Sequence, residues 1–126
     1  MARSDKKFKA IKQVYSLLSE SSAITELLGD KIYPMIAPPN TKGDFIVYRR
    51  EGYKREDTKM GVALQRSIFS IACISDDYYR GLDIADVVYD VLEGDHANVG
   101  LRIRLDDYAE DYVDSKFIQV LQFYLE

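Results

Sequence analysis

One long and largely apolar segment, residues 62–75, constrains the fold more than any other part of the chain. Its sequence, VALQRSIFSIACIS, is rich in the β-branched and aromatic residues that favour strands. Apolar residues occupy both alternating sets of positions: Phe69, Ile71 and Cys73 on one side, and Ile68, Ala72 and Ile74 on the other. Because an antiparallel strand with one wet face alternates apolar and polar residues, this pattern predicts that both faces are covered. The chain's own helices can cover one face, and another subunit is a candidate for the other.

A helix and a second strand follow this segment, so residues 62–105 predict a β-α-β unit. The helix is expected over residues 76–93, with Ser75, Asp76 or Asp77 as its N-cap and Gly94 at its end. Its apolar stripe consists of Leu82, Ala85, Val88, Tyr89 and Leu92. The strand is expected over residues 99–105, where leucine and isoleucine alternate with arginine, so one of its faces is wet.

The remaining elements predict an α+β architecture. Apolar residues at helical spacing predict an amphipathic helix over residues 5–19 and a short second helix that is capped by Ser22 and ends at Gly29. Strands are expected at residues 31–37, 45–50 and 116–125. We therefore expect one α+β domain over residues 1–126, with an antiparallel-dominated sheet of about four to five strands and two main helices packed on one face.

The composition is that of a soluble globular domain, with 47% hydrophobic and 30% charged residues. No apolar run is long enough to span a membrane, and no apolar signal core follows the basic N-terminus, so neither a membrane partner nor secretion is expected. The single cysteine, Cys73, excludes an internal disulfide and is expected to be a small buried hydrophobe in a reducing compartment.

Charge is unevenly distributed along the chain, although the net charge is only −4. Residues 1–66 contain 13 Lys and Arg against 8 Asp and Glu, whereas residues 67–126 contain 4 against 13. Both halves can simply be solvated surface. The alternative is a molecule with a basic face and an acidic face, which could pair head to tail with its own copies and close into a ring. The overall acidity disfavours specific nucleic-acid binding.

Two charged segments are the candidate interaction sites. Residues 49–60 predict either a long hairpin loop or strand ends that project beyond the sheet, and a mobile tip without function is the alternative. Residues 106–114 predict an acidic turn, either a solvated turn or a binding patch, and their spacing matches no calcium loop. The candidate interaction residues are Arg49, Arg50, Tyr53, Lys54, Arg55, Lys59, Asp106, Asp107, Tyr108, Glu110, Asp111 and Tyr112.

The sequence offers little for catalysis. It contains no phosphate-binding glycine loop, nucleophile elbow, dinucleotide fingerprint or paired His/Cys ligand spacing. His96, the only histidine, is expected in an exposed turn without an evident partner. We therefore expect a protein that is not an enzyme and that needs no cofactor or metal. Ten tyrosines against no tryptophan are compatible with a tyrosine-containing protein interface.

The order of these elements resembles the tail-completion (tail-terminator) proteins of long-tailed, siphovirus-type phages and prophages. The resemblance rests on VYSLLS at 14–19, AITELLGDKIYP at 23–34, Ala37-Pro38 and the strand FIVY at 45–48. It continues with the strand at 66–73, the Asp-Tyr-Tyr helix start at 77–79, the acidic turn and the final strand. It covers nearly the whole chain after about Lys9. In one departure, Gly43-Asp44 stands where the family usually has a proline before its second strand.

This resemblance implies a structural role in virion assembly. Tail terminators form a ring, commonly a hexamer, that ends polymerisation of the tail tube and offers a surface to the head connector. The resemblance therefore implies a homo-oligomer whose partners are the tail-tube protein and a head-connector protein. It also implies assembly in the host bacterial cytoplasm and a place at the head-proximal end of the virion tail. Residues 49–60 are then expected at a ring face or lumen, and residues 106–114 against a basic neighbour.

Two other classes of protein remain open at the level of sequence. A different head–tail connector component, such as a neck or head-completion protein, would share a ring architecture but bind on the portal side. A small-ligand-binding α+β domain, or an enzyme of unrecognised type, would instead show a concave pocket with clustered polar groups.

Overall fold

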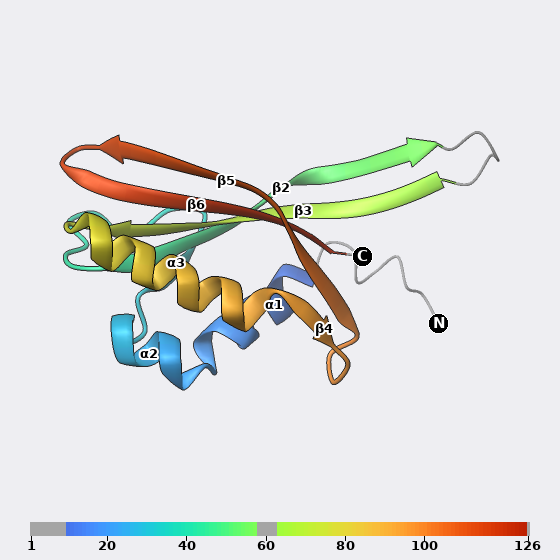
Figure 1. The fold of residues 1–126 in the computed structure, drawn as a ribbon, viewed down its shortest axis with the longest axis horizontal. Helices are drawn as coiled ribbons and strands as arrows, with labels where there is room; N and C mark the ends of the chain where they lie inside the picture. Colours follow the sequence, from blue (N-terminus) through green and yellow to red (C-terminus); the bar gives the residue numbers. More distant parts are fainter. Residues whose placement is uncertain (1–9, 58–62, 126) are drawn as a thin grey trace.

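The computed structural model describes the backbone of residues 10–57 and 63–125, and the side chains of residues 10–52 and 67–125. Along this part of the chain the elements are α1 (Ala10–Ser19), α2 (Ser22–Leu28), β1 (Ile32–Pro34), β2 (Phe45–Asp57), β3 (Ala63–Ser75), α3 (Tyr78–Leu92), β4 (Gly94–His96), β5 (Leu101–Val113) and β6 (Lys116–Leu125). The described helices gather on one side of a long, curled sheet, and none of them lies on the other side (Figure 1).

The sheet has six strands in the order β1-β2-β3-β6-β5-β4. The pair β1–β2 is parallel and the other pairs are antiparallel, so the sheet is mixed. The α+β class is confirmed, and the expected antiparallel-dominated sheet is confirmed in part: four of the five described pairs are antiparallel, but the sheet is mixed and has six strands, not four to five. The additional strand is β4, which has only three residues and is too short to show a period of two, and the parallel pair comes from β1, which lies within the expected strand at residues 31–37.

The β-α-β unit exists, but its two long strands are not neighbours. After β3, helix α3 leads into the short strand β4 and then into β5, while β6 lies between β3 and β5. The pairing places Ile71 of β3 opposite Leu121 of β6, and Leu121 opposite Tyr108 of β5. Both long apolar strands are therefore central, which is why each carries apolar residues on both alternations.

Local capping explains where the helices begin and end. The Asp77 side chain accepts a hydrogen bond from the Arg80 backbone N–H at 2.9 Å and caps α3, so Asp77 is the N-cap among the three expected candidates. Helix α2 is capped by Ser21, whose hydroxyl accepts from the Ile24 N–H at 3.4 Å, and not by the expected Ser22. Gly29 ends α2 with a φ of +66°, a conformation that glycine adopts without steric cost.

The core is the apolar layer between the helices and the β3–β6 pair. Phe69 and Phe123 are directly paired across these strands and stack with their ring centroids 5.4 Å apart. From the helix side, α1 contributes Val14 and Leu18, and α3 contributes a buried stripe. The buried residues of that stripe are Gly81, Ile84, Ala85, Val88 and Leu92. Tyr89, which the sequence places in the stripe, is 40% exposed.

A buried polar contact fixes the start of β2 against the start of α3. Asp44 is only 6% exposed, and its carboxylate accepts a hydrogen bond from the Ser75 hydroxyl at 2.8 Å and pairs with the Arg80 guanidinium. Gly43 precedes it with a φ of +77°. These two residues stand where the family pattern has a proline, so here a tertiary contact orders the entry into the strand.

The sheet face that points away from the helices carries apolar rows that run across the strands. In one row Val47, Ala72, Val120 and Ala109 are successive cross-strand neighbours. In the next row, Phe45, Ile74 and Ile118 are neighbours. No described helix packs on this face (Figure 1). The expectation that the chain's helices cover one face of β3 is confirmed, and no described helix covers the other face.

Replacement of Phe69 by alanine should lower the free energy of unfolding by about 3–5 kcal/mol, because it removes a fully buried ring and leaves a cavity in the core. Denaturant unfolding followed by circular dichroism measures this change. Tyr79→Ala is the matched control: Tyr79 is 73% exposed, so its loss should change stability by less than about 0.5 kcal/mol. Equal effects of the two substitutions would contradict this assignment of the core.

Candidate assembly surfaces

The acidic segment at residues 106–114 is a strand and not a turn. Strand β5 continues to Val113, and the chain reverses only at Asp114 and Ser115, which have φ values of +52° and +65°. Charged residues outnumber apolar ones here, so no apolar alternation indicates a strand. The strand forms because β6 provides the pairing, from Asp107 opposite Gln122 to Val113 opposite Lys116.

The outer edge of β5 has no strand beside it over most of its length. Strand β4 pairs only with Leu101, Arg102 and Ile103, so the sheet ends at β5 from Arg104 to Val113 within the described chain. A bulge between Leu105 and Asp107 bends the strand at this point. Such an edge presents unpaired backbone groups that can pair with another chain.

Three carboxylate side chains accept hydrogen bonds from backbone N–H groups of this edge. The Glu93 carboxylate accepts from the N–H of Leu105 at 2.7 Å. Asp107 and Asp111 each accept from the N–H of the following residue, Tyr108 and Tyr112, at 2.8 Å. Two of the predicted interaction residues therefore shield the edge of their own strand, a role that sequence reasoning did not assign.

The tyrosines of β5 belong to a cluster with α3 and β6. The Tyr78 hydroxyl donates to Glu110 at 2.7 Å, and the Tyr108 hydroxyl donates to the side-chain oxygen of Gln119. Burial raises the pKa of Tyr108 to about 12, and the nearby Glu110 carboxylate contributes to this rise. The hydrogen bond to Glu110 is the main cause that raises the pKa of Tyr78 above 10.0. The cluster thus joins three elements around one carboxylate.

Aromatic rings extend this cluster to the surface. Tyr112 packs on Phe117 with centroids 4.8 Å apart, and Tyr78 contacts both Phe117 and Tyr79. Tyr112 and Tyr79 are 59% and 73% exposed. Exposed tyrosines of this kind favour a protein interface. Sequence reasoning missed Tyr78, Phe117 and Gln119 as partners, because no local pattern connects Tyr78 with Glu110 or gives the β5–β6 register that brings Gln119 and Phe117 to the β5 tyrosines.

The basic residues begin where β2 leaves its pairing with β1. Strand β1 pairs with Ile46, Val47 and Tyr48 only, so the outer edge of β2 is without a neighbouring strand from Arg49 to Asp57 in the described chain. Residues 49–57 therefore form a strand end that projects with β3 beyond the helices (Figure 1), which confirms this alternative over the long loop up to Asp57.

Of the predicted basic residues, only Arg49 and Arg50 have described side chains, and both are exposed. Arg49 donates to the Glu51 carboxylate at 3.1 Å. This contact, followed by the hydrogen bond from Ser70, lowers the pKa of Glu51. The side chains of Tyr53, Lys54 and Arg55 lie outside the described part, and Lys59 lies outside the described residues altogether.

The two predicted sets of residues do not form one site. The basic set lies on β2 and the acidic set on β5, with β3 and β6 between them. One polar row of the sheet connects them: Arg49, Ser70, Gln122 and Asp107 are successive cross-strand neighbours on the face away from the helices. The row begins with a cation at one edge and ends with a carboxylate at the other.

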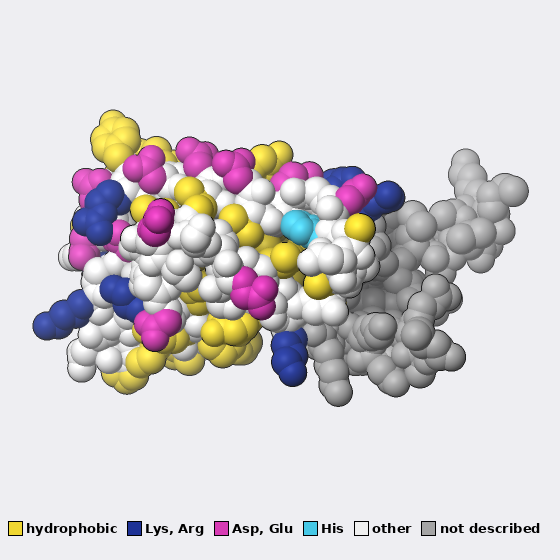
Figure 2. Space-filling view, turned by 90° about the horizontal axis from the view of Figure 1, so that it is seen from below, with side chains coloured by type: hydrophobic (Ala, Val, Ile, Leu, Met, Phe, Trp, Pro, Cys, Tyr) yellow, Lys and Arg dark blue, Asp and Glu magenta, His cyan; other side chains and the backbone are white. Residues whose placement is uncertain are grey.

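The C-terminal half has more carboxylates than cations, and its cations are already paired. Each of its four Lys and Arg side chains contacts a carboxylate: Arg80 with Asp44, Arg102 and Arg104 with Asp95, and Lys116 with Asp76. On the helix side, acidic side chains gather along one long margin of the described surface, while Lys and Arg stand singly at its ends and opposite margin (Figure 2). The charge asymmetry of the sequence is thus partly spatial.

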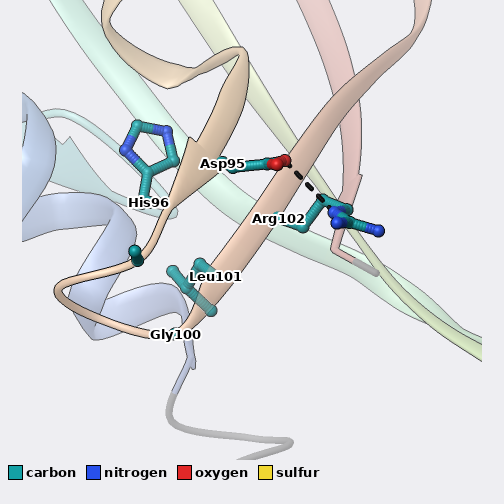
Figure 3. Close-up of a pocket in the computed structure, with 6 residues that line it drawn as sticks. Asp95, His96, Gly100, Leu101 and Arg102 are labelled. Carbon is teal, nitrogen blue, oxygen red and sulfur yellow. Dashed lines mark hydrogen bonds and ion pairs between the residues drawn. The ribbon is translucent and has the colours of Figure 1, made fainter.

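His96 lies in strand β4 and not in an exposed turn. It is half-buried, and its Nε2 lies 2.7 Å from the Leu92 carbonyl oxygen. Figure 3 shows it beside an open pocket of about 380 Å³, with its ring turned away from Asp95 and Arg102. Hydrogen bonding from Arg104 lowers the pKa of Asp95, which also pairs with Arg102 at 3.1 Å. In this pocket, His96 is therefore already in contact with a backbone carbonyl, and the Asp95 carboxylate is already paired with two arginines.

The described side chains contain no group of three His, Cys, Asp or Glu residues placed to hold a metal ion. No described helix is long and apolar enough to cross a membrane. Cys73 is fully buried, and burial raises the pKa of its thiol, as expected for a cysteine that acts as a small hydrophobe.

Alkaline titration tests the tyrosine cluster. Because the folded protein favours the neutral form of Tyr108, the stability that this group contributes is complete below pH 10 and is lost as the pH rises towards about 12. Tyr108→Phe should therefore reduce the fall in melting temperature over this range. Tyr33→Phe on β1, outside the cluster, is the matched control. An unchanged pH profile in Tyr108→Phe would show that Tyr108 is not held neutral.

Comparisons with known proteins show the fold and the family that this chain shares. One solved chain, from the "virion of native gene transfer agent (GTA) particle", has the same fold with a TM-score of 0.70 and 22% identity over 89% of each chain. No curated protein matches the chain. The family model described as "Tail completion protein gp17" matches residues 12–115. The chain therefore belongs to the tail-completion protein gp17 family, whose members are structural components of phage tails.

Proposed function

We propose that this protein forms a ring, in the family manner a hexamer, at the head-proximal end of the tail tube. The ring ends polymerisation of the tube and provides the surface to which the head connector binds. Such a role needs no catalysis, and it places the protein in the virion after assembly in the host cytoplasm. Membership of the tail-completion family and the fold shared with a virion chain support this proposal.

The observation that carries the proposal furthest is the uncovered sheet face. Its apolar rows, which begin with Val47 and Phe45, have no covering layer within the described chain. A hollow of about 180 Å³ lies in this face between Met35, Val47, Arg49, Glu51, Ser70, Ala72 and Val120. Contiguous apolar surface of this kind is typical of a protein interface. A neighbouring subunit or the tube would supply the missing layer.

The two strand pairs that extend beyond the helices give the subunit two different ends. The β2–β3 pair extends at one end of the sheet and the β5–β6 hairpin reaches the other (Figure 1). The first begins with the exposed Arg49 and Arg50, and the second carries Asp107, Glu110 and Asp111. A ring that meets a tube on one face and a connector on the other needs two unlike faces, and these ends provide them.

The mass of the purified protein tests ring formation directly. We expect a hexamer, or a shift towards one with rising concentration, by light scattering behind a sizing column. High salt should weaken the ring if opposed charges contribute, because salt screens exposed charges beyond about 8–10 Å. The same measurement in the presence of tube protein covers a ring that forms only on its tube. A strict monomer under both conditions would contradict the proposal.

Charge reversal tests the role of the β2 residues. In Arg49→Glu/Arg50→Glu, we expect normal folding but reduced capping of tail tubes, seen as overlong tubes by electron microscopy. Reversal of Lys54 and Arg55 in addition should deepen the defect. Lys12→Glu/Lys42→Glu is the matched control, because it reverses two exposed charges outside this strand. Normal tube length in the first variant, or an equal defect in the control, would remove the assignment of these residues to a tube or connector contact.

A further inference from the structure

The sheet ends in two long strand edges of opposite character. On β2 the edge is open from Arg49 to Asp57, and on β5 it is open from Arg104 to Val113, within the described chain. The first edge begins with Arg49 and Arg50, whereas the second carries Asp106, Asp107, Glu110 and Asp111. Isolated soluble proteins do not keep long open edges without protection, so each edge needs either a guard or a partner.

We infer that these two edges pair with each other between copies of this chain, so that the β5 edge of one subunit adds to the β2 edge of the next. This inference rests on the proposed ring and names its seam. The contact is heterologous, because one patch binds a different patch on its neighbour, and heterologous contacts generate rings when the rotation closes. It also joins edges of unlike charge, because residues 49–57 carry four Lys and Arg against three Asp and Glu, whereas residues 104–113 carry one Arg against four Asp and Glu.

The strand directions suit this pairing. From β2 through β3 and β6 to β5, each step is antiparallel, so β5 runs opposite to β2. Where a sheet continues from one subunit into the next, the neighbour's β2 keeps its direction and therefore meets β5 antiparallel. Both open edges also present the same two faces, so the apolar rows of neighbouring subunits would lie on the same side.

The open parts of the two edges lie towards opposite ends of the sheet (Figure 1). Full pairing therefore requires neighbours to be offset along their strands. An offset of this kind is what closure of a sheet into a barrel requires, because strands that tilt from the axis must stagger their register. The geometry points to a ring whose strands are inclined to its axis.

The side chains of β5 select the partner. Asp107 and Asp111 hold the N–H groups of Tyr108 and Tyr112, so these donors point away from β6. Because strand N–H groups alternate, the N–H of Glu110 points the same way. A second β5 edge would bring like charges together and be repelled. A basic edge can draw the carboxylates away and free the donors for strand pairing.

Cross-linking tests the seam. Arg49→Cys and Ala109→Cys place thiols at exposed positions on the two edges, and the native Cys73 is fully buried. A bis-maleimide that spans about 13 Å, the length of four strand residues, reaches across registers that place the two positions within about four residues of each other. The differently tagged variants are mixed as purified protein and also with tail tubes from producing cells. We expect the mixed product to dominate and neither variant alone to cross-link.

Cross-linking of Ala109→Cys with itself, or no mixed product in either sample, would overturn the seam. Arg49→Cys mixed with Asp83→Cys, on the exposed side of α3, is the control and should give no product. Capped tubes without the mixed product would contradict the seam alone. The mixed product with uncapped tubes would contradict the proposed function and leave the seam standing.

A backbone substitution tests strand pairing separately from charge. Glu110→Pro removes the outward N–H, and proline is tolerated on an edge where that group faces solvent. Glu110→Ala removes the same carboxylate and its bond to Tyr78 but keeps the N–H. We expect Glu110→Pro to reduce the mixed product about tenfold, the effect of one lost hydrogen bond, and Glu110→Ala to leave it nearly unchanged. Equal yields from two folded variants, checked by circular dichroism, would overturn backbone pairing.

Discussion

The apolar layer between α3 and the β3–β6 pair determines both the interior and the exterior of this molecule. The stacked pair Phe69 and Phe123, with Ile71 and Leu121 beside it, draws every described helix to one face of the sheet. The chain has no further helix for the other face within its described part. The same two central strands therefore also present apolar residues on the face that no described helix covers. In the proposed ring, one pair of strands would serve both folding and assembly.

Much of this architecture could be predicted from sequence because it depends on local patterns. The strand at residues 62–75 and the helix that follows are found from their periodicities, and Asp77 from its capping position. The order of strands is different. Nothing local shows that β6 enters between β3 and β5, since that depends on long-range pairing. Strand β4 is too short to show a period, so the described sheet has one strand more than predicted.

The sequence indicates candidate interaction residues but not how they are arranged in space. Charge alone marks Asp107, Glu110 and Asp111 in the sequence, yet their contacts in the structure differ. Two of them, Asp107 and Asp111, accept hydrogen bonds from the next backbone N–H, and Glu110 accepts one from Tyr78. The sequence predicts a turn at residues 106–114 because acidic residues disfavour strands, but pairing with β6 overrides this preference. His96 was assigned to a loop because the three residues of β4 have no recognisable pattern.

The Asp44 contact has a consequence for the order of folding. A proline before β2 would restrict the backbone locally, before any tertiary structure exists. Asp44 instead depends on Ser75 and Arg80, more than thirty residues away, so this corner is ordered only when α3 docks. Contacts of long sequence separation form late and slow the search. In a newly synthesised chain, the start of β2 would therefore be fixed only after α3 has formed, whereas the other end of β2 pairs with nearby residues of β3.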